Sequence, residues 1–482
     1  MKIFFCLFLF VGSLQGQEPG AALTLKEAVQ EALEKSPEVA QVRRQWEEAA
    51  LEEPLLLSVL DPKLQLSYSY IDDQTPRAAP VFEGVRSQTE RSEAGIVKNT
   101  LLGTEAKLLF FNERIENPSL FRVLDPSVDS RMSFEVRQPL LRYFWGRPDV
   151  ARRRQARART NTFLNQVRQR ENEVAAQAAR AYFQLYFSQE QVKIKEGGVA
   201  DATRLVKKYK EKKGYGLSEE SDLLQAEASL QTQKTEVLIA QSQLEQAQIS
   251  LLAALQRLRE KKEASHLVPL TKPMEMTSLS TSAVLQGSRR GDVFAARAQR
   301  EAAEWSLRTQ ILDTFPDLSV NASYGWGGLD SHSSDSWRNL GTKDHPVRTA
   351  GVSLLVPFGF REERLLRKQS RFRLHAAQAE EQRVEQKSFR EIKDAAESLR
   401  LAHERVEASQ RLVELEKRKF KAEERNAQRG RSSTDLLVRF QQDLRRAESE
   451  FLRAQTDEAI SLINLGVATG RLLELLELQN RL

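Results

Sequence analysis

The sequence has one cysteine and therefore no second thiol with which to form a disulfide. Cys6 lies in a short apolar segment, residues 3–11, which follows the positive Lys2 and is followed by small and polar residues up to Gly16. This order is typical of a secretory signal peptide, so we expect residues 1–16 to be removed. The mature chain then has no thiol, no disulfide and, because Cys6 lies too early for a lipoprotein cleavage site, no lipid anchor.

Long apolar runs are also missing. After the first segment, no stretch approaches the roughly 20 apolar residues of a transmembrane helix. An exported chain of this kind is either soluble or crosses an outer membrane as a β-barrel. Aromatic residues make up only 7% of the chain and charged residues 29%, which favours long solvated helices over a large compact core. The net charge is +6, but an exported protein meets little nucleic acid, so no nucleic-acid partner is expected.

A catalytic constellation is missing as well. The five histidines are scattered without ligand spacing, at His266, His332, His345, His375 and His403. His332 with Asp335, or Asp344 with His345, offers a metal-binding alternative to ordinary solvated loop residues. There is no phosphate loop and no nucleophile elbow. We therefore expect no enzymatic activity, no cofactor and no metal site, and energy for any transport has to come from a partner.

Four short segments alternate between apolar and polar residues: 63–70, 131–137, 318–326 and 349–358. In the first, Leu64, Leu66, Tyr68 and Tyr70 face one way and polar residues face the other. A period of two predicts β-strands. Apolar residues opposite polar ones suit a barrel wall between lipid and a polar lumen, although an ordinary half-buried antiparallel sheet has the same pattern. The polar segments between the strands, 72–91 and 327–344, are predicted to be loops.

Two long helical runs follow the strands. Residues 146–212 and 361–428 contain no proline except Pro148, which suits a first helical turn. Each run of some 65 residues predicts roughly 100 Å of helix. Glycines then break the pattern, and apolar residues recur every three and four positions from Val237 and from Leu437, which is typical of coiled-coil packing.

The two halves of the chain repeat one another. Gly216 and Gly430 are 214 residues apart, and the same offset separates Leu223 from Leu437 and, further along, other pairs: Ser218 and Ser432, Leu230 and Leu444, Ala240 and Ala454. We interpret this as an internal duplication. The first structural repeat would span residues 17–270 and the second 271–482, each made of two strands followed by a long helical hairpin.

Several motifs in the right order resemble the outer-membrane efflux protein (TolC-like) family over nearly the whole mature chain. They are Leu25-Lys26-Glu27-Ala28 with Ser36-Pro37, Arg137-Gln138-Pro139-Leu140-Leu141, Val356-Pro357-Phe358-Gly359, Gly216-Leu217-Ser218 with residues 222–227, and Gly430 with residues 432–437. The resemblance implies a mixed α/β membrane protein of the cell outer membrane with a periplasmic extension. It also implies a homotrimer, in which each protomer gives four amphipathic strands to a twelve-stranded transmembrane β-barrel and long coiled-coil helices to a periplasmic α-helical tunnel.

The function implied by this resemblance is that of the outer-membrane channel component of a tripartite efflux or type I secretion system. Such a channel is a passive exit duct for small molecules or proteins, with a periplasmic adaptor and an inner-membrane pump as partners. Physics independently requires an oligomer, because four strands cannot close and open sheet edges are not viable in lipid. The number three comes from the resemblance alone. The alternative is a periplasmic adaptor protein, which carries one helical hairpin beside small β-domains.

Three groups of residues are candidate functional sites. The hairpin tips are expected to dock the adaptor or pump, or else merely to reverse the chain: Tyr215, Gly216, Leu217, Ser218, Arg429, Gly430, Arg431 and Ser432. At the periplasmic entrance, the resemblance implies a ring of aspartates. Asp435 is the nearest match, and the second acidic position falls on Val438 or Arg439, so cation selectivity does not follow. Asp435 also suits a helix start, where a carboxylate favours the macrodipole.

The third group is a pair of basic clusters that follow the second strand of each repeat. The first cluster is Arg147, Arg152, Arg153, Arg154, Arg157 and Arg159, and the second is Arg361, Arg364, Arg367 and Lys368. Anionic headgroups attract such side chains by about 1 kcal/mol each. We expect a collar that contacts outer-membrane lipids where barrel and tunnel meet. The alternative is a solvated helix face.

Overall fold

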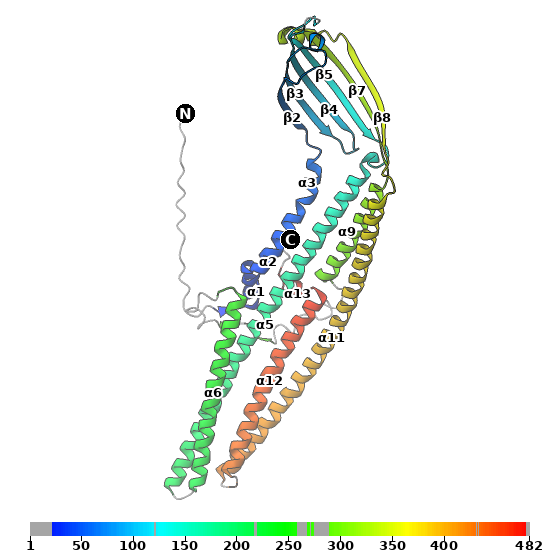
Figure 1. Ribbon diagram of the computed structural model, residues 1–482. Helices are drawn as coiled ribbons and strands as arrows, with labels where there is room; N and C mark the ends of the chain where they lie inside the picture. The colour runs from blue at the N-terminus through cyan, green and yellow to red at the C-terminus, as the bar shows by residue number, and fades with distance from the viewer. Residues whose placement is uncertain are drawn as a thin grey trace, which may run out of the picture. The chain divides into compact units, whose positions relative to one another are not determined.

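The computed structural model describes residues 22–119, 122–215, 219–257, 268–269, 271–273, 289–429, 431 and 433–478 (Figure 1). The expected signal peptide and Cys6 lie outside these ranges. None of the helices in the described ranges contains a segment apolar and long enough to span a lipid bilayer. The chain forms two compact units. We call Met1–Arg44, Asn165–Phe294 and Arg383–Leu482 the hairpin unit, and Gln45–Leu164 and Ala295–Gln382 the sheet unit.

The long helices follow the duplication. Helix α5 (Arg147–Gly214) and helix α11 (Arg361–Gln428) each have 68 residues, and their first residues, like their last, are 214 positions apart. Helices α6 (Glu220–Ala254) and α12 (Thr434–Thr469) begin at the same offset. The predicted helical runs are therefore confirmed. The proposed repeat boundary at 270 stays a prediction, because each compact unit combines segments from both halves of the chain.

The hairpin unit has an apolar core between its helices. Helix α1 (Leu25–Lys35) begins with a capping box, in which Thr24 and Glu27 satisfy each other's backbone N–H groups. The short helix α13 (Leu472–Leu475) and a two-residue parallel pair, β1 (Ala22–Leu23) with β6 (Val268–Pro269), complete this end of the unit. The fully buried large side chains that α5, α6 and α12 contribute to this core include Tyr182, Phe183, Leu251, Leu462, Ile463 and Leu465. Heptad residues such as Ala240, Ala247 and Ala454 are buried, which confirms the coiled-coil seam.

The sheet unit contains one six-stranded antiparallel sheet in the order β2-β3-β4-β5-β7-β8. The strands are β2 (Lys63–Asp73), β3 (Ser87–Asn99), β4 (Glu105–Glu116), β5 (Ser127–Pro139), β7 (Asp317–Asp330) and β8 (Pro346–Leu355). The four predicted strands are confirmed as β2, β5, β7 and β8. The expected number of four is corrected to six, because β3 and β4 form an additional hairpin.

Sequence periodicity missed this hairpin for a physical reason. Strand β3 has few apolar side chains, and β4 has apolar residues on both faces at Leu108, Leu109, Phe110 and Phe111, so neither strand alternates. The two predicted loops are also corrected. Segment 72–91 contains the short helix α4 (Pro80–Glu83) and the start of β3, and segment 327–344 contains the end of β7 and helix α10 (Ser333–Gly341).

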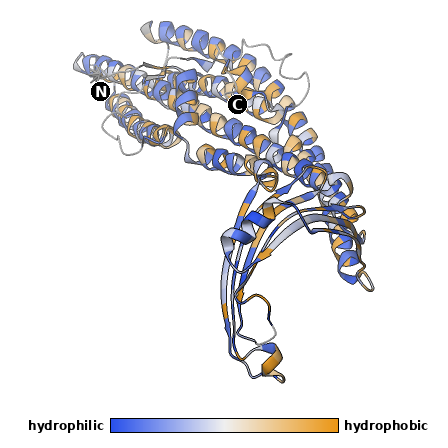
Figure 2. Ribbon diagram, turned by 90° about the horizontal axis from the view of Figure 1, so that it is seen from above, coloured by the Kyte–Doolittle hydropathy of each residue, from blue (hydrophilic) through white to orange (hydrophobic). Residues whose placement is uncertain are grey.

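The sheet is curved (Figure 2), and its register gives it two unlike faces. On one face, the apolar face, the register places Leu64, Ile96, Leu108, Phe134 and Tyr324 in a single row across the strands. On the other, the polar face, a parallel row contains Lys107, Glu135, Ser323 and Thr349. The pleat therefore gives the sheet a mainly apolar and a mainly polar face, apart from β4, which is apolar on both.

The two ends of the sheet differ as well. At the helix end, the sheet connects to α3 (Glu52–Ser58), α5, α9 (Gly291–Asp313) and α11, and helix α2 (Pro37–Ala50) precedes α3. The turn between β3 and β4 also lies at this end. At the loop end, α10 packs on the apolar face: the rings of Trp337 and Phe110 are edge to face at 5.7 Å, and Ser336 Oγ lies 2.7 Å from the carbonyl oxygen of Gly328.

Each strand-to-helix junction contains two successive residues with left-handed backbone conformation. They are Trp145 (φ 52°) and Gly146 (φ 66°) before α5, within the 3-10 turn η1 (Phe144–Gly146), and Gly359 (φ 87°) and Phe360 (φ 48°) before α11. Both pairs obey the 214-residue offset. The duplicated turn therefore has the same backbone in both halves, although the glycine occupies the second position in one half and the first in the other.

Candidate functional site

The polar face of the sheet carries charges of both signs in close pairs. Arg91 and Glu113 approach to 2.6 Å, and Lys107 and Glu105 to 2.9 Å. Near the helix end, Arg137 and Asp317 approach to 3.2 Å. Two hollows, of about 690 and about 480 Å³, open on this face and are lined by residues from β3 to β8. The polar face is therefore a hydrophilic, hollowed surface suited to contact with water and hydrated solutes.

In the single chain, the apolar face is exposed to solvent. Leu66 is 69% and Val352 72% exposed, although both are large apolar side chains. Towards the loop end, two cationic side chains make cation–π contacts. Arg348 lies 5.9 Å from the ring of Tyr324, and Lys343 lies 5.9 Å from that of Trp326. An apolar band bordered by aromatic residues is typical of the lipid-facing side of an outer-membrane barrel.

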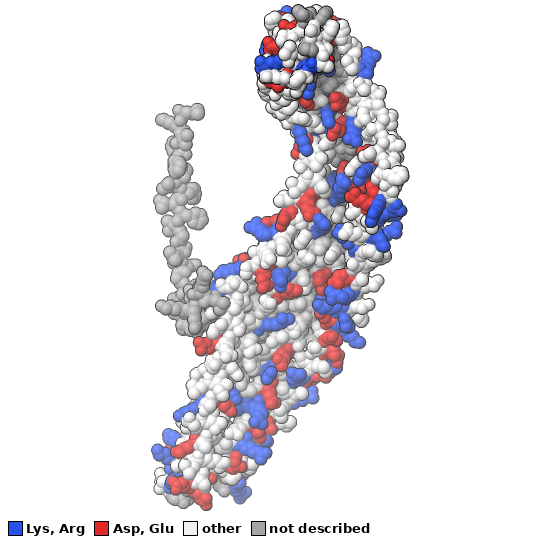
Figure 3. All heavy atoms as spheres, in the orientation of Figure 1, with Lys and Arg blue, Asp and Glu red and all other residues white. Residues whose placement is uncertain are grey.

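The sheet has two unpaired edges in the described structure, at β2 and β8. All residues of β8 are exposed, as are those of β2 except Asp73. Figure 3 shows largely uncharged atoms over the β7 and β8 side of the sheet, whereas basic and acidic side chains are interspersed over the helices. Edge strands offer free backbone N–H and C=O groups to another chain.

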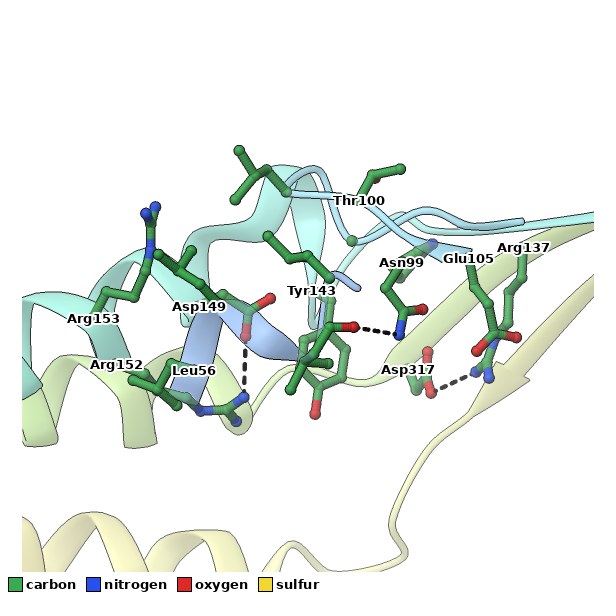
Figure 4. A pocket seen from close by; sticks show the side chains of 16 residues that line it. Leu56, Asn99, Thr100, Glu105, Arg137, Tyr143, Asp149, Arg152, Arg153 and Asp317 are labelled. Atoms are coloured by element: carbon green, nitrogen blue, oxygen red, sulfur yellow. Dashed lines mark hydrogen bonds and ion pairs between the residues drawn. The ribbon is translucent and has the colours of Figure 1, made fainter. Parts of the chain in front are cut away.

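A pocket of about 430 Å³ lies at the helix end of the sheet (Figure 4). It is lined by α3, the β3–β4 turn, the end of β5 and the start of α5. Asn99 Nδ2 donates to the carbonyl oxygen of Val59 at 3.3 Å, and Arg152 lies 3.2 Å from Asp149. The turn of the additional hairpin is thus part of the junction between sheet and helices.

The first basic cluster is largely engaged within the sheet unit. Arg152 is half-buried between Asp149 and Asp313; burial lowers its pKa, but the charge of Asp313 and the hydrogen bond to Tyr143 outweigh this and raise it. Arg154 stacks over the ring of Trp305 at 4.6 Å. Ion pairs also hold Arg157 to Glu53 (2.6 Å) and Arg159 to Glu52 (3.4 Å). Arg147 lies over Phe144 at 5.4 Å, and Arg153 lines the pocket of Figure 4.

The second basic cluster lies at the start of α11. Arg364 donates to the carbonyl oxygens of Gly359 and Phe360, where the chain turns into the helix. Lys368 lies 5.7 Å from the ring of Phe372, and both residues are exposed. Arg361 is exposed and Arg367 is half-buried. The expected contact of both clusters with lipid stays a prediction.

The hairpin tips are described in part. Tyr215 is 81% exposed, and Arg429 and Arg431 are exposed. The other tip residues lie outside the described ranges: Gly216, Leu217, Ser218, Gly430 and Ser432. The expected docking role of the tips therefore stays a prediction.

Just behind the tips, polar contacts link the two hairpins. Asp435 is exposed and accepts a hydrogen bond from Gln225 at 2.8 Å, and Thr434 donates to Asp222 at 2.7 Å. Val438 is buried in the apolar cluster beneath these contacts, whereas Arg439 is exposed. Sequence reasoning missed the role of Asp222 and Gln225, because helical periodicity does not tell which residues of two distant hairpins meet.

A group of potential metal ligands lies at the loop end of the sheet. The ligand atoms of Asp330, His332 and Asp335 lie within 4.8 Å of one another. The carboxylate of Asp330 already accepts hydrogen bonds from the backbone of Ser331 (2.7 Å) and from Asn339 (3.3 Å). Asp330 therefore also has a structural role, because these hydrogen bonds stabilise the loop between β7 and α10.

Comparisons with known proteins agree with this architecture. Residues 285–471 match the family model described as outer membrane efflux protein. This segment, in the second half of the chain, is therefore similar to the outer membrane efflux proteins. The family's description places its members in the outer membrane, in agreement with the localisation expected from the sequence. No curated protein sequence matches the chain.

Solved structures of outer membrane channels share the fold. The outer membrane protein VceC from Vibrio cholerae is 15% identical with a TM-score of 0.65, over 92% of this chain and 96% of that one. The CmeC outer membrane channel of Campylobacter jejuni is 17% identical with a TM-score of 0.63, over 93% and 86%. CusC, whose structures concern folding and transmembrane channel formation, is 14% identical with a TM-score of 0.67, over 95% of both chains. The α/β architecture of this chain is thereby confirmed over almost its full length.

Proposed function

We propose that this chain belongs to the outer membrane efflux proteins and is the outer-membrane channel component of a tripartite efflux or type I secretion system. It acts as a passive exit duct and has no enzymatic activity of its own. The observation that carries the proposal is the curved sheet with an exposed apolar face and a hollowed, charged polar face. Lipid on one side and water on the other satisfy both faces at once.

We further propose that the duct is a homotrimer. The two unpaired sheet edges support assembly, because open edges are not viable in lipid. Exposed apolar side chains on α11 also support it, namely Phe389, Leu401, Leu412 and Leu415, of which Phe389 is 73% exposed. Apolar surface of this kind usually marks a contact with another chain.

The partners of the duct would be a periplasmic adaptor and an inner-membrane pump, which supplies the energy. The exposed Tyr215, Arg429 and Arg431 at the tips are the proposed contact, and Asp435 lies at the proposed periplasmic entrance. The alternative function, a periplasmic adaptor, is less well supported. Adaptors carry one helical hairpin, whereas this chain has two, α5–α6 and α11–α12, and a six-stranded sheet.

Assembly and conductance test the channel directly. We expect protein extracted with detergent to migrate differently on a gel before and after heating, as outer-membrane barrels do. In planar bilayers it should give discrete conductance steps. A monomer that is extracted into aqueous buffer without detergent would show that the channel function is wrong.

Docking is tested separately at the tips. Gly430→Glu and Leu217→Glu, each made alone, should abolish export while the oligomer still assembles and inserts. Gln241→Glu, at an exposed position of α6 away from the tip, is the control and should export normally. Normal export by both tip variants would exclude the docking role.

A further inference from the structure

The geometry points to an eighteen-stranded barrel, formed from six strands of each of three copies, with a lumen wide enough for bulky hydrophilic solutes. This inference rests on the proposed trimeric channel and goes beyond it. The family resemblance implies four strands per copy and twelve in all. The additional hairpin, β3 with β4, adds two strands to each copy and therefore six to the barrel.

The additional hairpin is a full part of the sheet. Every residue of β2 has a partner in β3, from Lys63 with Val97 to Asp73 with Ser87. The ladder continues without interruption from β3 to β4 and from β4 to β5. Removing the hairpin from the wall would break two such ladders, and the exposed backbone groups could not be satisfied in lipid.

The side chains of the hairpin follow the two faces of the sheet. Ile96 and Leu108 lie on the apolar face, in the same row as Leu64 and Phe134. On the polar face, the hairpin places Phe111 between two guanidinium groups, Arg91 at 5.5 Å and Arg131 at 6.0 Å. A segment that folded into the lumen as a plug would not need an apolar face, so the hairpin is suited to the wall.

The turn of the hairpin is also fixed at the helix end. Gly103 has φ +80° and lies against the carbonyl oxygen of Tyr143, and the carbonyl oxygen of Leu101 lies against Gly146. The side chain of Lys98 donates to the carbonyl oxygen of Leu60 at 2.5 Å, and Asn99 donates to Val59. These contacts hold the turn at the junction and keep the hairpin in line with its neighbours.

A second copy of the chain fits the two free edges. With six alternating strands, β2 and β8 run in opposite directions, so β8 of one copy and β2 of the next would pair antiparallel, as all neighbours in the sheet do. The lengths agree, with eleven and ten residues. Apolar side chains lie at the helix end of both edges, at Leu64 and Val352.

The number of strands determines the width of the duct. Barrel diameter grows roughly linearly with strand number, so eighteen strands give about 1.5 times the diameter of twelve, and barrels of 16–18 strands leave an aqueous channel. The charged polar face would line this channel. The cargo class is therefore hydrated solutes of larger cross-section than the duct of a twelve-stranded barrel admits.

Cysteine labelling of intact cells tests whether the hairpin is in the wall. The only cysteine of the sequence is Cys6 in the expected signal peptide, so a single introduced thiol has no background. Glu93→Cys, on the polar face of the hairpin, should react with a membrane-impermeant maleimide. Ile96→Cys, on its apolar face, should not. Reaction of both variants would place the hairpin outside the wall and overturn the inference.

The strand number and width are tested with two further measurements. Thr349→Cys combined with Gln65→Cys, Ser67→Cys or Ser69→Cys should give a disulfide-linked ladder that ends at three copies. Ser133→Cys should react with maleimides carrying larger polyethylene glycol chains than it does in a variant that lacks residues 87–116. A ladder that ends at two copies, or an unchanged size limit, would overturn the inference.

These outcomes are distinct from a failure of the channel function. If the trimer forms and changes its migration on heating but the size limit does not depend on the hairpin, only the wide barrel is wrong. If no oligomer inserts at all, the proposed function fails first. Should the variant without residues 87–116 not assemble, the labelling of Ile96→Cys and the disulfide ladder decide.

Discussion

Gly146 lies directly against the backbone of Leu101, so that a methyl group at position 146 would come within 1.9 Å of the Leu101 carbonyl oxygen. This contact joins the turn of the β3–β4 hairpin to the start of α5. Gly359 occupies the corresponding junction before α11 and also has positive φ, but an added methyl group there would meet nothing within 4 Å. Substitutions at the two glycines therefore separate the free-energy cost of the left-handed backbone from that of a steric clash.

We predict that Gly146→Ala destabilises the protein much more than Gly359→Ala. Both substitutions place a side chain in the left-handed region, at a cost of roughly 1–2 kcal/mol. Only Gly146→Ala also displaces the Leu101 carbonyl, and overpacking of this kind adds about 1–3 kcal/mol. The temperature at which the oligomer dissociates on a gel measures the difference. Equal dissociation temperatures would show that the hairpin turn does not depend on this contact.

We predict that the links behind the tips hold the two hairpins of a protomer together. The double variant Asp222→Ala and Gln225→Ala removes the hydrogen bonds to Thr434 and Asp435. Each bond contributes about 0.5–1.5 kcal/mol, so the hairpins should separate more readily and the resting conductance should rise. Gln241→Ala, also exposed on α6, should leave conductance unchanged. No increase in the double variant would exclude this role for the contacts.

The basic clusters lead to a prediction about lipid. The second cluster is the better test, because Arg152 and Arg157 of the first are held by carboxylates of their own unit. Changing Arg361, Arg367 and Lys368 together to glutamate should weaken insertion into anionic vesicles, by about 1 kcal/mol per side chain, and leave neutral vesicles less affected. Arg411→Glu, on the same helix, is the control. Equal losses in both lipids would contradict the collar.

A pH-dependent contact joins α11 and α12. His403 Nδ1 lies 2.6 Å from Glu458 Oε1, and this hydrogen bond, together with the negative charge of Glu458, raises the pKa of His403. Because the folded-state pKa is the higher one, the stabilisation is complete below the unfolded value of about 6.5 and is lost as the pH rises through the folded value. His403 is 63% exposed, so we expect a small effect, about 0.2–1 kcal/mol.

The measurement is the melting temperature of the helices at pH 5.5 and at pH 8.5. His403→Gln should lower it at the acidic pH and have little effect at the alkaline pH. His375→Gln is the control, because the ring of His375 contacts Gln378 on the same helix. The same loss at both pH values in His403→Gln would mean that packing, and not the protonated imidazole, stabilises this contact.

The sequence by itself determined the elements whose pattern is local. Leu64, Leu66, Tyr68 and Tyr70 alternate within a single strand, and the apolar residues after Leu437 recur with the helical period, so both elements could be predicted without any neighbour. The duplication was equally visible, because Gly216 and Gly430 are 214 positions apart and neighbouring residues repeat at the same offset. The boundaries of α5 and α11 repeat that offset.

Only the tertiary structure decided the width of the sheet and the contacts between distant segments. Strand β3 is mostly polar and β4 is apolar on both faces, so their place in the sheet depends on backbone hydrogen bonds to β2 and β5, which no sequence period records. No sequence pattern records the close approach of Gly146 to Leu101 or the hydrogen bond between Gln225 and Asp435 either. In each case, residues far apart in the sequence meet because the fold brings their backbones or side chains together.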